Sequence, residues 1–456
     1  MSALCAVLDV GKTHVKLHVI DEQLNSRFCR SRDNPVVEAD LYPHYDIDGL
    51  WRWICKALTE AAATFDITVI AVTTHGAAAA LVHPKAGESG LVMPIMDYEF
   101  ADVACESDYQ AIRPPFAKTY SPALPLGLNL GRQLFWQQRY CQQAFGDAQY
   151  ILPYPQYWAW RLTGVAVAEV TSWGCHTDLW QPAIGDYSAL VDSLGIRSKL
   201  PPLVSAGDVI GTVTAEVSAQ TGLSPKCKVI AGLHDSNASY LRYLQRKKPF
   251  TVVSTGTWVI SFSTATEMTA LVEQQDMLAN VDINGHPVAC ARFMGGREFE
   301  QICRQTGSDP QSGFTEADLH QLIEAQVFAL PDFSGGSGPF GGRNPECQAG
   351  ARNGTAVASL YCALMLDYEL ELLQAQGDII VEGVWLRDVL QCRLLAQLRR
   401  GQPVLLSTDE TGTVTGAARL ALDVGSSRQE LIAVESTHLS GLDSYRRDWR
   451  AKLGVL

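Results

Sequence analysis

The start of the chain alternates apolar and polar side chains in a way that is typical of two paired strands. A continuous apolar run from Ala3 to Leu8 is followed by the polar segment Asp9-Val-Gly-Lys-Thr13. Beyond it, Val15, Leu17 and Val19 alternate with polar residues. Because a strict period of two indicates a half-buried strand, we predict a β-hairpin with a glycine-containing tip.

A helix and a further strand are predicted next. Residues 48–64 place these apolar side chains on one helical face: Leu50, Trp53, Ile54, Ala57 and Leu58. Asp46 or Asp48 can cap the start of this amphipathic helix. A buried-type strand, Ile67 to Val72, then runs into Thr73-Thr-His-Gly76.

The opening pattern returns about half a chain later. Phe250 to Ser254 has a strand pattern, Thr255-Gly-Thr257 is a polar turn, and Trp258 to Phe262 again has a strand pattern. Such a repeat indicates duplicated domains with equivalent hairpins that face each other. The remaining pattern predicts a helix over 356–374, a strand over 378–384, a helix over 386–399, a strand over 404–407 and a helix start at Gly416. Strands that alternate with helices predict an α/β protein.

The length of the chain predicts two domains. Its 456 residues exceed what one hydrophobic core normally holds. We place the domains at 1–245 and 246–456. Residues 95–200 are rich in Trp, Tyr, Pro and Gln and lack long periodic segments, so we expect substrate-shaping insertions there.

Net charge and cysteine spacing limit the partners and the compartment that we expect for the protein. A net charge of −13 disfavours nucleic acid and anionic membranes as partners and suits a small neutral substrate. The 12 cysteines show no C-x-x-C spacing, and no signal peptide or membrane span is evident, so we expect a cytoplasmic protein. The sequence leaves a homodimer open, because an interface helix and a core helix share one pattern.

A relaxed P-loop pattern, Ala6 to Thr13, does not have the context of a P-loop. A P-loop requires a helix that starts at its Lys-Thr pair, whereas a strand pattern follows Thr13 here. Two glycine turns suggest a different phosphate site, in which backbone N–H groups of both turns meet a phosphate chain and Asp9 holds its magnesium. Domain closure would then exclude water.

Taken together, these segments resemble the FGGY carbohydrate kinases over nearly the whole chain. The resemblance implies a two-domain actin-like ATPase (ribonuclease H-like) fold with a duplicated core and an interdomain active-site cleft. It further implies a sugar-binding N-terminal domain, a nucleotide-binding C-terminal domain, ATP and Mg²⁺ as cofactors, and a small ketose as the partner.

The resemblance assigns nucleotide-binding residues to both halves. Asp9, Gly11, Lys12 and Thr13 match the first phosphate motif, with Asp9 on the metal, although Lys12 stands where the family has Thr. Thr255, Gly256 and Thr257 match the second phosphate motif. Gly383 and Gly416 match the adenosine segment, where a glycine lets a flat base approach the backbone.

The catalytic assignment rests on Gly232-Leu-His234-Asp235, which follows a buried strand. This segment resembles the family's catalytic segment, so Asp235 is the expected base that accepts the proton of the attacking hydroxyl. Asp235 is also expected to cap the helix after it.

The resemblance also implies acceptor-binding residues, which are His75, Gly76, Asp97, Glu99, His234 and Asp235. Imidazoles and carboxylates suit polyols because each forms directional hydrogen bonds. The family commonly has Arg where this chain has Glu99, so the sugar contacts are expected to differ.

His234-Asp235-Ser236 and Ser254 to Trp258 are similar to the corresponding motifs of rhamnulose and fuculose kinases. That similarity implies phosphorylation of a 6-deoxyketohexose, L-fuculose or L-rhamnulose, at its C1 hydroxyl. The alternatives are a ribulose or xylulose kinase, an actin-like ATPase that acts on partners, and a catalytically silent sugar sensor.

Overall fold

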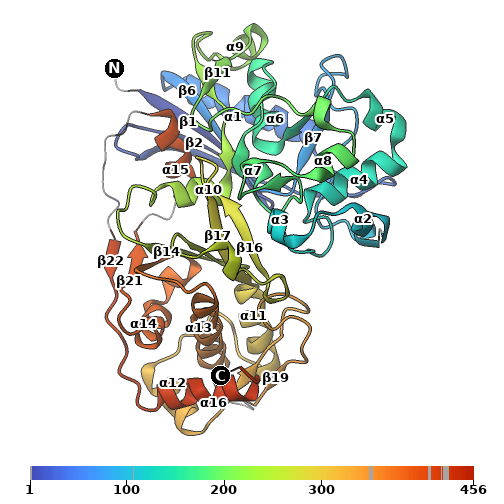
Figure 1. Cartoon of the computed structure of the whole chain (residues 1–456). Helices are drawn as coiled ribbons and strands as arrows, with labels where there is room; N and C mark the ends of the chain where they lie inside the picture. Colours follow the sequence, from blue (N-terminus) through green and yellow to red (C-terminus); the bar gives the residue numbers. More distant parts are fainter. Residues whose placement is uncertain are drawn as a thin grey trace. The chain divides into compact units, whose positions relative to one another are not determined.

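The computed structural model describes residues 3–105, 107–348, 353–408, 412–422, 424 and 431–455. They form two compact units, each of which contains a seven-stranded sheet (Figure 1). Unit 1 comprises 1–244, 279–287 and 411–428, and unit 2 comprises 245–278, 288–410 and 429–456. The predicted mixed α/β fold with two domains is confirmed.

The sheet of unit 1 has the order β11-β12-β6-β1-β2-β3, with β13 paired to β6. Its strands are β1 (Leu4–Val10), β2 (His14–Ile20), β3 (Ser26–Asp33), β6 (Ile67–Thr74), β11 (Val209–Thr212), β12 (Lys228–Ile230) and β13 (Leu233–His234). The predicted hairpin is β1–β2, which is antiparallel with Val10 opposite Val15. Strands β6, β12 and β13 extend the sheet in parallel with β1.

Helices and short strands surround this sheet. The helices are α1 (Ile47–Ala62), α2 (Ser107–Ile112), α3 (Phe116–Thr119), α4 (Leu130–Tyr140), α5 (Gln142–Asp147), α6 (Tyr154–Thr163), α7 (Val170–Trp173), α8 (Ala189–Ser193), α9 (Ala215–Thr221), α10 (Asp235–Leu241) and α15 (Gly412–Ala421). The short strands are β4 (Val36–Val37), β5 (His44–Tyr45), β7 (Ala79–Val82), β8 (Tyr150–Pro153), β9 (Trp180–Gln181) and β10 (Asp186–Tyr187).

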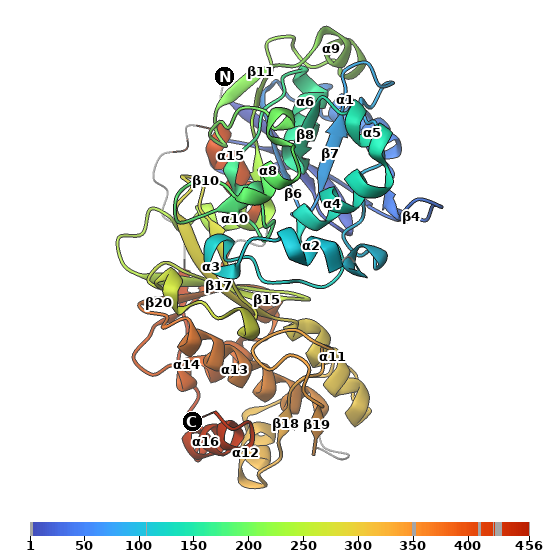
Figure 2. The ribbon, with the colours of Figure 1, turned by 45° about the vertical axis from the view of Figure 1, so that its right-hand side comes forward.

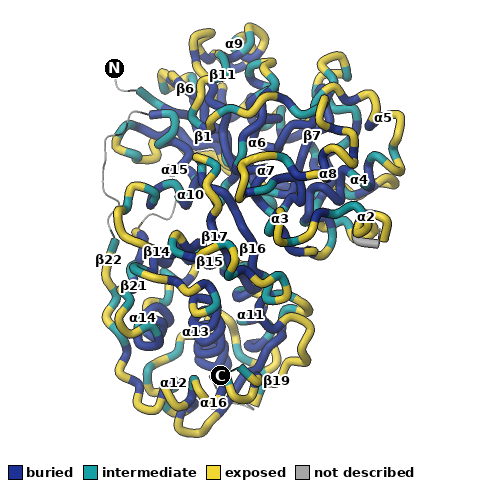
Figure 3. The backbone as a smooth tube through the Cα atoms, viewed as in Figure 1, coloured by how far each residue is buried: buried dark blue, intermediate teal, exposed yellow. Residues whose placement is uncertain are grey.

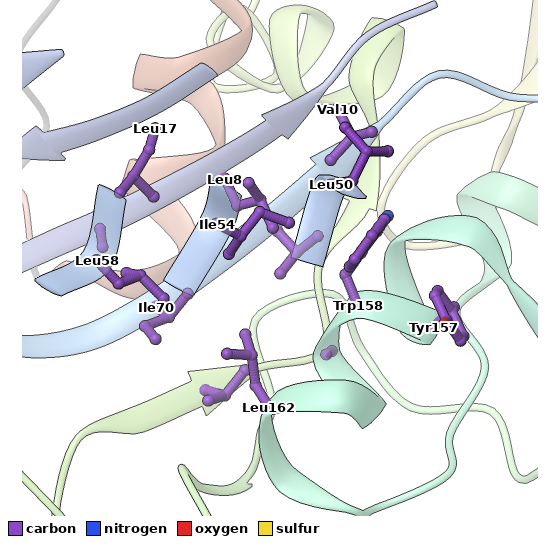
Figure 4. Packing of buried hydrophobic residues seen from close by; sticks show 14 of the residues in the cluster. Leu8, Val10, Leu17, Leu50, Ile54, Leu58, Ile70, Tyr157, Trp158 and Leu162 are labelled. Atoms are coloured by element: carbon purple, nitrogen blue, oxygen red, sulfur yellow. The ribbon is translucent and has the colours of Figure 1, made fainter. Parts of the chain in front are cut away.

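Both faces of the unit 1 sheet are buried, because successive side chains of a strand point to opposite faces. Leu8 and Val10 of β1 pack with residues of α1 and α6 such as Ile54 and Trp158 (Figure 4). On the other face, Val7 packs in a cluster that includes residues of α10 and α15. Asp9 shares the alternation of Val7, so the strand directs it toward the α10 side.

Helix α1 forms as its sequence predicts. Asp46 caps it by accepting a hydrogen bond from the Gly49 N–H at 2.9 Å. The apolar face buries Leu50, Ile54 and Leu58, each of which contributes about 2 kcal/mol when removed from water.

The sheet of unit 2 has the order β16-β17-β15-β14-β20-β21-β22. Its strands are β14 (Phe250–Thr255), β15 (Val259–Ser263), β16 (Met277–Val281), β17 (Pro287–Phe293), β20 (Asp378–Gly383), β21 (Val404–Ser407) and β22 (Leu431–Ala433). The pairing β17-β15-β14-β20-β21 repeats the directions of β3-β2-β1-β6-β12 in unit 1. The duplication inferred from the two hairpins is therefore present in the strand pairing.

Unit 2 is completed by five helices of the described residues and a short ribbon. These are α11 (Gly295–Thr306), α12 (Glu316–Glu324), α13 (Gly354–Leu372), α14 (Val389–Leu398), α16 (Leu442–Lys452), β18 (Ala329–Leu330) and β19 (Glu346–Cys347). Helix α13 lies beside α14 (Figure 2) and is buried from Gly354 to Leu370 (Figure 3). Burial raises the pKa of Glu369 on this helix well above its ordinary value, because burial disfavours the charged carboxylate.

Two helix boundaries differ from the sequence prediction. Gly416 lies inside α15 and not at its start, because the helix already runs from Gly412. Helix α14 begins at Val389, since residues 384–387 form a 3₁₀ turn. Within the described ranges, no helix is long and apolar enough to cross a membrane.

Candidate functional site

Three parallel strands of unit 1 end at the same edge of the sheet. Thr73 of β6 lies opposite both Asp9 of β1 and Leu233 of β13. The chain therefore carries His75, the residue after β6, and Asp235, the residue after β13, to one sheet edge. Parallel α/β sheets bind their ligands at this carboxyl edge.

Asp235 is the first residue of α10 and is 29% exposed. Its Oδ1 accepts a hydrogen bond from the Ser236 N–H at 2.6 Å and lies 3.3 Å from Nε2 of His234. The expectation that Asp235 caps α10 is wrong, because His234 is the N-cap and Asp235 is the first helical residue. The helix start still holds the carboxylate while leaving part of it accessible. A partly exposed carboxylate on a rigid element has the properties that a general base requires.

Two residues that the sequence analysis missed hold the segment before Asp235. The hydroxyl of Thr171 accepts a hydrogen bond from the His234 N–H at 3.0 Å and donates to Oε2 of Glu169. Glu169 is fully buried, and burial raises its pKa to about 8. No local pattern distinguishes a carboxyl that caps a four-residue helix, α7, from a surface acid.

Asp9 lies near Asp235 at this edge. Burial, followed by the charge of Asp235, raises the pKa of Asp9 to about 7, and Lys16 opposes this shift. Two carboxyl groups that disfavour each other's charge suit a divalent cation between a nucleotide and the protein. Within the described residues, no group of three or more His, Cys, Asp or Glu side chains could hold a metal ion.

The turn between β1 and β2 is closed by its own hydrogen bonds. The Gly11 N–H donates to the His14 carbonyl at 2.9 Å. Asn34 holds the turn from outside, with its side chain donating to the Gly11 carbonyl at 2.9 Å and its N–H donating to the Thr13 carbonyl at 2.8 Å. The Gly11 N–H is thus engaged within the turn, which differs from the expectation that it points at a phosphate.

Lys12 extends from this turn toward the predicted acceptor residues. Its ammonium group donates to Oδ1 of Asp97 and lies 3.6 Å from Oε2 of Glu99. The hydroxyl of Tyr45 donates to the same Asp97 oxygen at 3.2 Å. The structure therefore joins Lys12, assigned from sequence to the nucleotide, with Asp97 and Glu99, assigned to the sugar.

His75 is buried with a defined tautomer. Its Nδ1 lies 2.8 Å from the Gly76 carbonyl, which can only accept, so Nδ1 carries the proton. Its Nε2 is buried and has no hydrogen-bond partner among the described residues. Burial lowers the pKa of His75 to about 4, so the ring is neutral and Nε2 can only accept a hydrogen bond.

In unit 2, Thr255 is the last residue of β14, and its side chain links β14 to the end of β20. Its hydroxyl donates to the Glu382 carbonyl at 2.6 Å and accepts from the Trp385 N–H at 3.1 Å. Gly383 has φ +91°, and a Cβ at this position would overlap the Thr255 carbonyl. Gly383 is thus required by the close approach of β14 and β20.

The turn after β14 packs on the start of α11. The Gly256 N–H closes the turn by donating to the Trp258 carbonyl at 2.9 Å, while Thr257 is exposed at its tip. The Gly296 N–H donates to the Thr257 carbonyl at 3.2 Å. Sequence analysis missed Gly295 and Gly296, although a glycine pair directly after a strand signals a close backbone approach.

Gly416 has a packing role within unit 1. A Cβ at this position would overlap the carbonyl of Ala238, so the glycine lets α15 lie directly on α10. Gly383, which the sequence analysis grouped with Gly416, belongs to unit 2.

Comparisons with known proteins agree with this architecture. Residues 4–241 match the model of the FGGY family of carbohydrate kinases, N-terminal domain, and residues 247–430 match that of carbohydrate kinase FGGY, C-terminal domain. A carbohydrate kinase from Novosphingobium aromaticivorans is 34% identical, with a TM-score of 0.89 over 99% of both chains. The chain belongs to the FGGY family of carbohydrate kinases.

Two Escherichia coli K12 enzymes are more distant relatives. An L-fuculokinase is 27% identical over 56% of this chain, and an L-xylulose/3-keto-L-gulonate kinase is 26% identical over 36%. The aligned parts span 55% and 32% of these two relatives, so the chain matches about half the length of the first.

Proposed function

We propose that the protein is an ATP-dependent kinase that transfers the γ-phosphoryl group of ATP to a hydroxyl of a small neutral ketose. The observation that carries this proposal is the position of Asp235. A partly exposed carboxylate begins a helix at the sheet edge where the buried, acceptor-only Nε2 of His75 is also found. Family membership supplies the reaction class.

In the proposed reaction, Asp235 accepts the proton of the attacking hydroxyl as the bond to phosphorus forms. Thr171 and Glu169 hold the backbone before Asp235, so the base is positioned before the substrate arrives. His75 accepts a hydrogen bond from another hydroxyl of the sugar, because its Nε2 carries no proton. Asp9 would hold Mg²⁺, which supplies charge neutralisation to the phosphates.

Unit 2 is proposed to bind the nucleotide. The exposed tip at Thr257 and the N-terminus of the adjoining α11 suit phosphate oxygens, although the N–H groups of Gly256 and Gly296 are engaged within this corner. Gly383 brings the end of β20 against Thr255, which keeps this corner free of side-chain bulk.

For the acceptor we propose a 6-deoxyketohexose, L-fuculose or L-rhamnulose, phosphorylated at C1. Support comes from the motifs around Asp235 and Thr255 and from the L-fuculokinase relative. A pentulose is the second candidate, favoured by the relative that acts on L-xylulose.

The test is ADP release by the full chain with Mg-ATP and a panel of L-fuculose, L-rhamnulose, L-xylulose, D-xylulose, D-ribulose and glycerol. Turnover concentrated on one 6-deoxyketohexose supports the first candidate, and turnover concentrated on a pentulose supports the second. ATP hydrolysis that is independent of every sugar in the panel would contradict the kinase proposal.

A further inference from the structure

Lys12 does not extend along the turn that carries it. Its side chain is 19% exposed, and its ammonium group donates to Oδ1 of Asp97, whose side chain is 5% exposed. The second carboxylate, Oε2 of Glu99, lies 3.6 Å away and is largely in solvent. The ammonium therefore has one buried and one exposed counter-charge, which together fix its place in unit 1.

Two aromatic rings complete the surroundings of this cation. Nζ lies 4.8 Å from the ring centre of Tyr98 and 5.4 Å from that of Tyr45. Tyr45 also donates its hydroxyl to Oδ1 of Asp97, so one carboxylate oxygen binds both the ammonium and the phenol. Lysine loses about 2 kcal/mol of rotamer freedom when ordered. Contacts from two separate segments, Tyr45 and residues 97–99, offset that loss and keep the ammonium at Asp97.

The same two rings contact His75. Ring centres of His75 and Tyr45 are 5.2 Å apart, and those of His75 and Tyr98 are 5.8 Å apart. The buried Nε2 of His75 has no partner among the described residues and can only accept a hydrogen bond. One aromatic wall thus presents an acceptor, a carboxylate and a cation, which is a suitable set for neighbouring oxygens of a polyol.

The balance of charge favours a neutral acceptor. Asp97, Glu99 and Asp235 contribute carboxyl groups around this wall and the sheet edge, where Asp9 also lies, and the ammonium of Lys12 opposes those of Asp97 and Glu99. An acceptor that carries its own carboxylate would add a further negative charge beside groups that already repel it.

We propose that Lys12 is a specificity-determining residue of the acceptor site, which donates a hydrogen bond to an oxygen of a neutral ketose and does not bind the phosphates of ATP. The inference rests on the proposed function, because it names which substrate this cation serves. Asp97 and Tyr45 position the ammonium, and the ketose oxygen takes one of its remaining N–H donors.

The first test compares kinetics of the full chain with K12M and K12R. K12M should raise KM for the best ketose at least about ten-fold and change KM for Mg-ATP less than about two-fold, because only the acceptor loses a donor. K12R should fall between K12M and the wild type, since charge is kept but its geometry changes. The control is K56M, which removes an exposed lysine of α1.

A rise in KM for Mg-ATP with an unchanged KM for the ketose would overturn the assignment, as would equal rises in both. Gluconate serves as the charged probe. The wild type should prefer the ketose, and E99Q, which changes a side chain that is 60% exposed, should raise kcat/KM for gluconate relative to the ketose. An unchanged ratio in E99Q would contradict the role of charge.

A second test uses the wild-type chain and needs no turnover. Reductive methylation of Lys12 and Lys56, followed by peptide mass spectrometry, is compared without ligand, with L-fuculose and with Mg-ATP. L-Fuculose, or the panel ketose with the highest turnover, should slow methylation of Lys12 alone, and Mg-ATP should not.

The two proposals can fail separately. If no ketose is turned over, the kinase proposal fails. The methylation experiment then tests the role of Lys12 by itself. Protection by Mg-ATP, or labelling that no panel ketose slows, would overturn its assignment to the acceptor side, whereas protection by a ketose alone would retain it.

Discussion

The α-carbon of Gly76 faces the imidazole of His234, and a methyl group on it would lie 2.8 Å from Nε2. Gly76 follows β6, and His234 ends the parallel strand β13. The two strand ends can lie this close only because residue 76 has no side chain. Since His234 directly precedes Asp235, a change at Gly76 is transmitted to the proposed base.

G76A is therefore expected to lower kcat about 10- to 100-fold, because a displacement of the order of 1 Å at a reacting group has effects of this size. The matched control is G146A in α5, where an added methyl group meets no atom within 4 Å. Steady-state kinetics and circular dichroism of both variants check the prediction. Equal kcat values for G76A and G146A would contradict it.

D235N should abolish most turnover while leaving sugar binding nearly unchanged. Asparagine keeps the shape of the side chain but cannot accept the proton, and loss of a general base lowers rates about 10²- to 10⁴-fold. Single-turnover kinetics measure the chemical step, and calorimetry measures the sugar Kd. D448N, at an exposed position of α16, is the control. Turnover within about two-fold of the wild type would remove Asp235 as the base.

Two substitutions at His75 distinguish the roles of its two ring nitrogens. The terminal amide of glutamine reaches the place of Nε2, whereas that of asparagine reaches only the place of Nδ1. Because Nδ1 already donates to the Gly76 carbonyl, we expect the acceptor at Nε2 to bind the sugar. H75N should raise the ketose KM about ten-fold, and H75Q should raise it less. The reverse order would show that Nδ1 carries the function.

The same residue predicts a feature of the pH profile. Burial lowers the pKa of His75 to about 4, so the free enzyme should show no loss of kcat/KM from this ring between pH 6 and pH 8. A titration near pH 6.5 that disappears in H75Q would contradict the buried, neutral ring.

Glu169 should make the wild type less stable at alkaline pH. Its pKa is about 8 in the folded chain against an ordinary value of 4.5. Between these values the folded state binds a proton that the unfolded state does not, so its contribution to stability is full below pH 4.5 and is lost as the pH rises through 8. The slope is at most about 1.4 kcal/mol per pH unit.

E169Q cannot titrate, so its free energy of unfolding relative to the wild type should increase between pH 5 and pH 8.5. Urea denaturation at both pH values measures this difference. Other buried acids, such as Glu298 with a pKa of about 7, are present in both proteins and cancel. A difference that does not change with pH would show that Glu169 is ionised at neutral pH.

Alanine substitutions at Gly383 and Gly401 distinguish the cost of backbone strain from the cost of steric overlap. Both have positive φ, +91° and +93°, but only at Gly383 would a Cβ meet other atoms. G401A should cost about 1 kcal/mol, and G383A should cost a further ~1–3 kcal/mol because the methyl group meets the Thr255 carbonyl. Denaturant unfolding of the two variants measures the difference, and equal losses would exclude overlap as a cause.

Sequence patterns were sufficient for elements whose side chains follow a regular period. Both hairpins, helix α1 with its Asp46 cap and strand β20 were predicted because burial on one face leaves a repeat along the chain. The family resemblance was likewise carried by short motifs at strand ends, and family membership is confirmed.

Contacts between distant segments could not be predicted in this way. Lys12 and Asp97 are separated by 85 positions, and their pairing depends on how a turn and a loop lie in the folded unit. Glu169 leaves no periodic signal because its partners are the hydroxyl and the N–H of one residue, Thr171. The Gly11 N–H was expected to be open to a ligand, but a pattern does not show which carbonyl a turn N–H meets.

Helix α15 makes the assembly of unit 1 depend on the order of synthesis. Its residues Val414, Ala417 and Ala418, together with Leu422 directly after it, fill the cluster that also contains Val7. At translation rates of about 5–20 residues per second, the ribosome needs roughly 10 to 40 s to proceed from residue 244 to residue 422. Until then, the face of the first sheet that carries Val7 lacks the cover of α15, so a nascent or truncated chain that ends near residue 245 would expose apolar side chains to chaperones and to other chains.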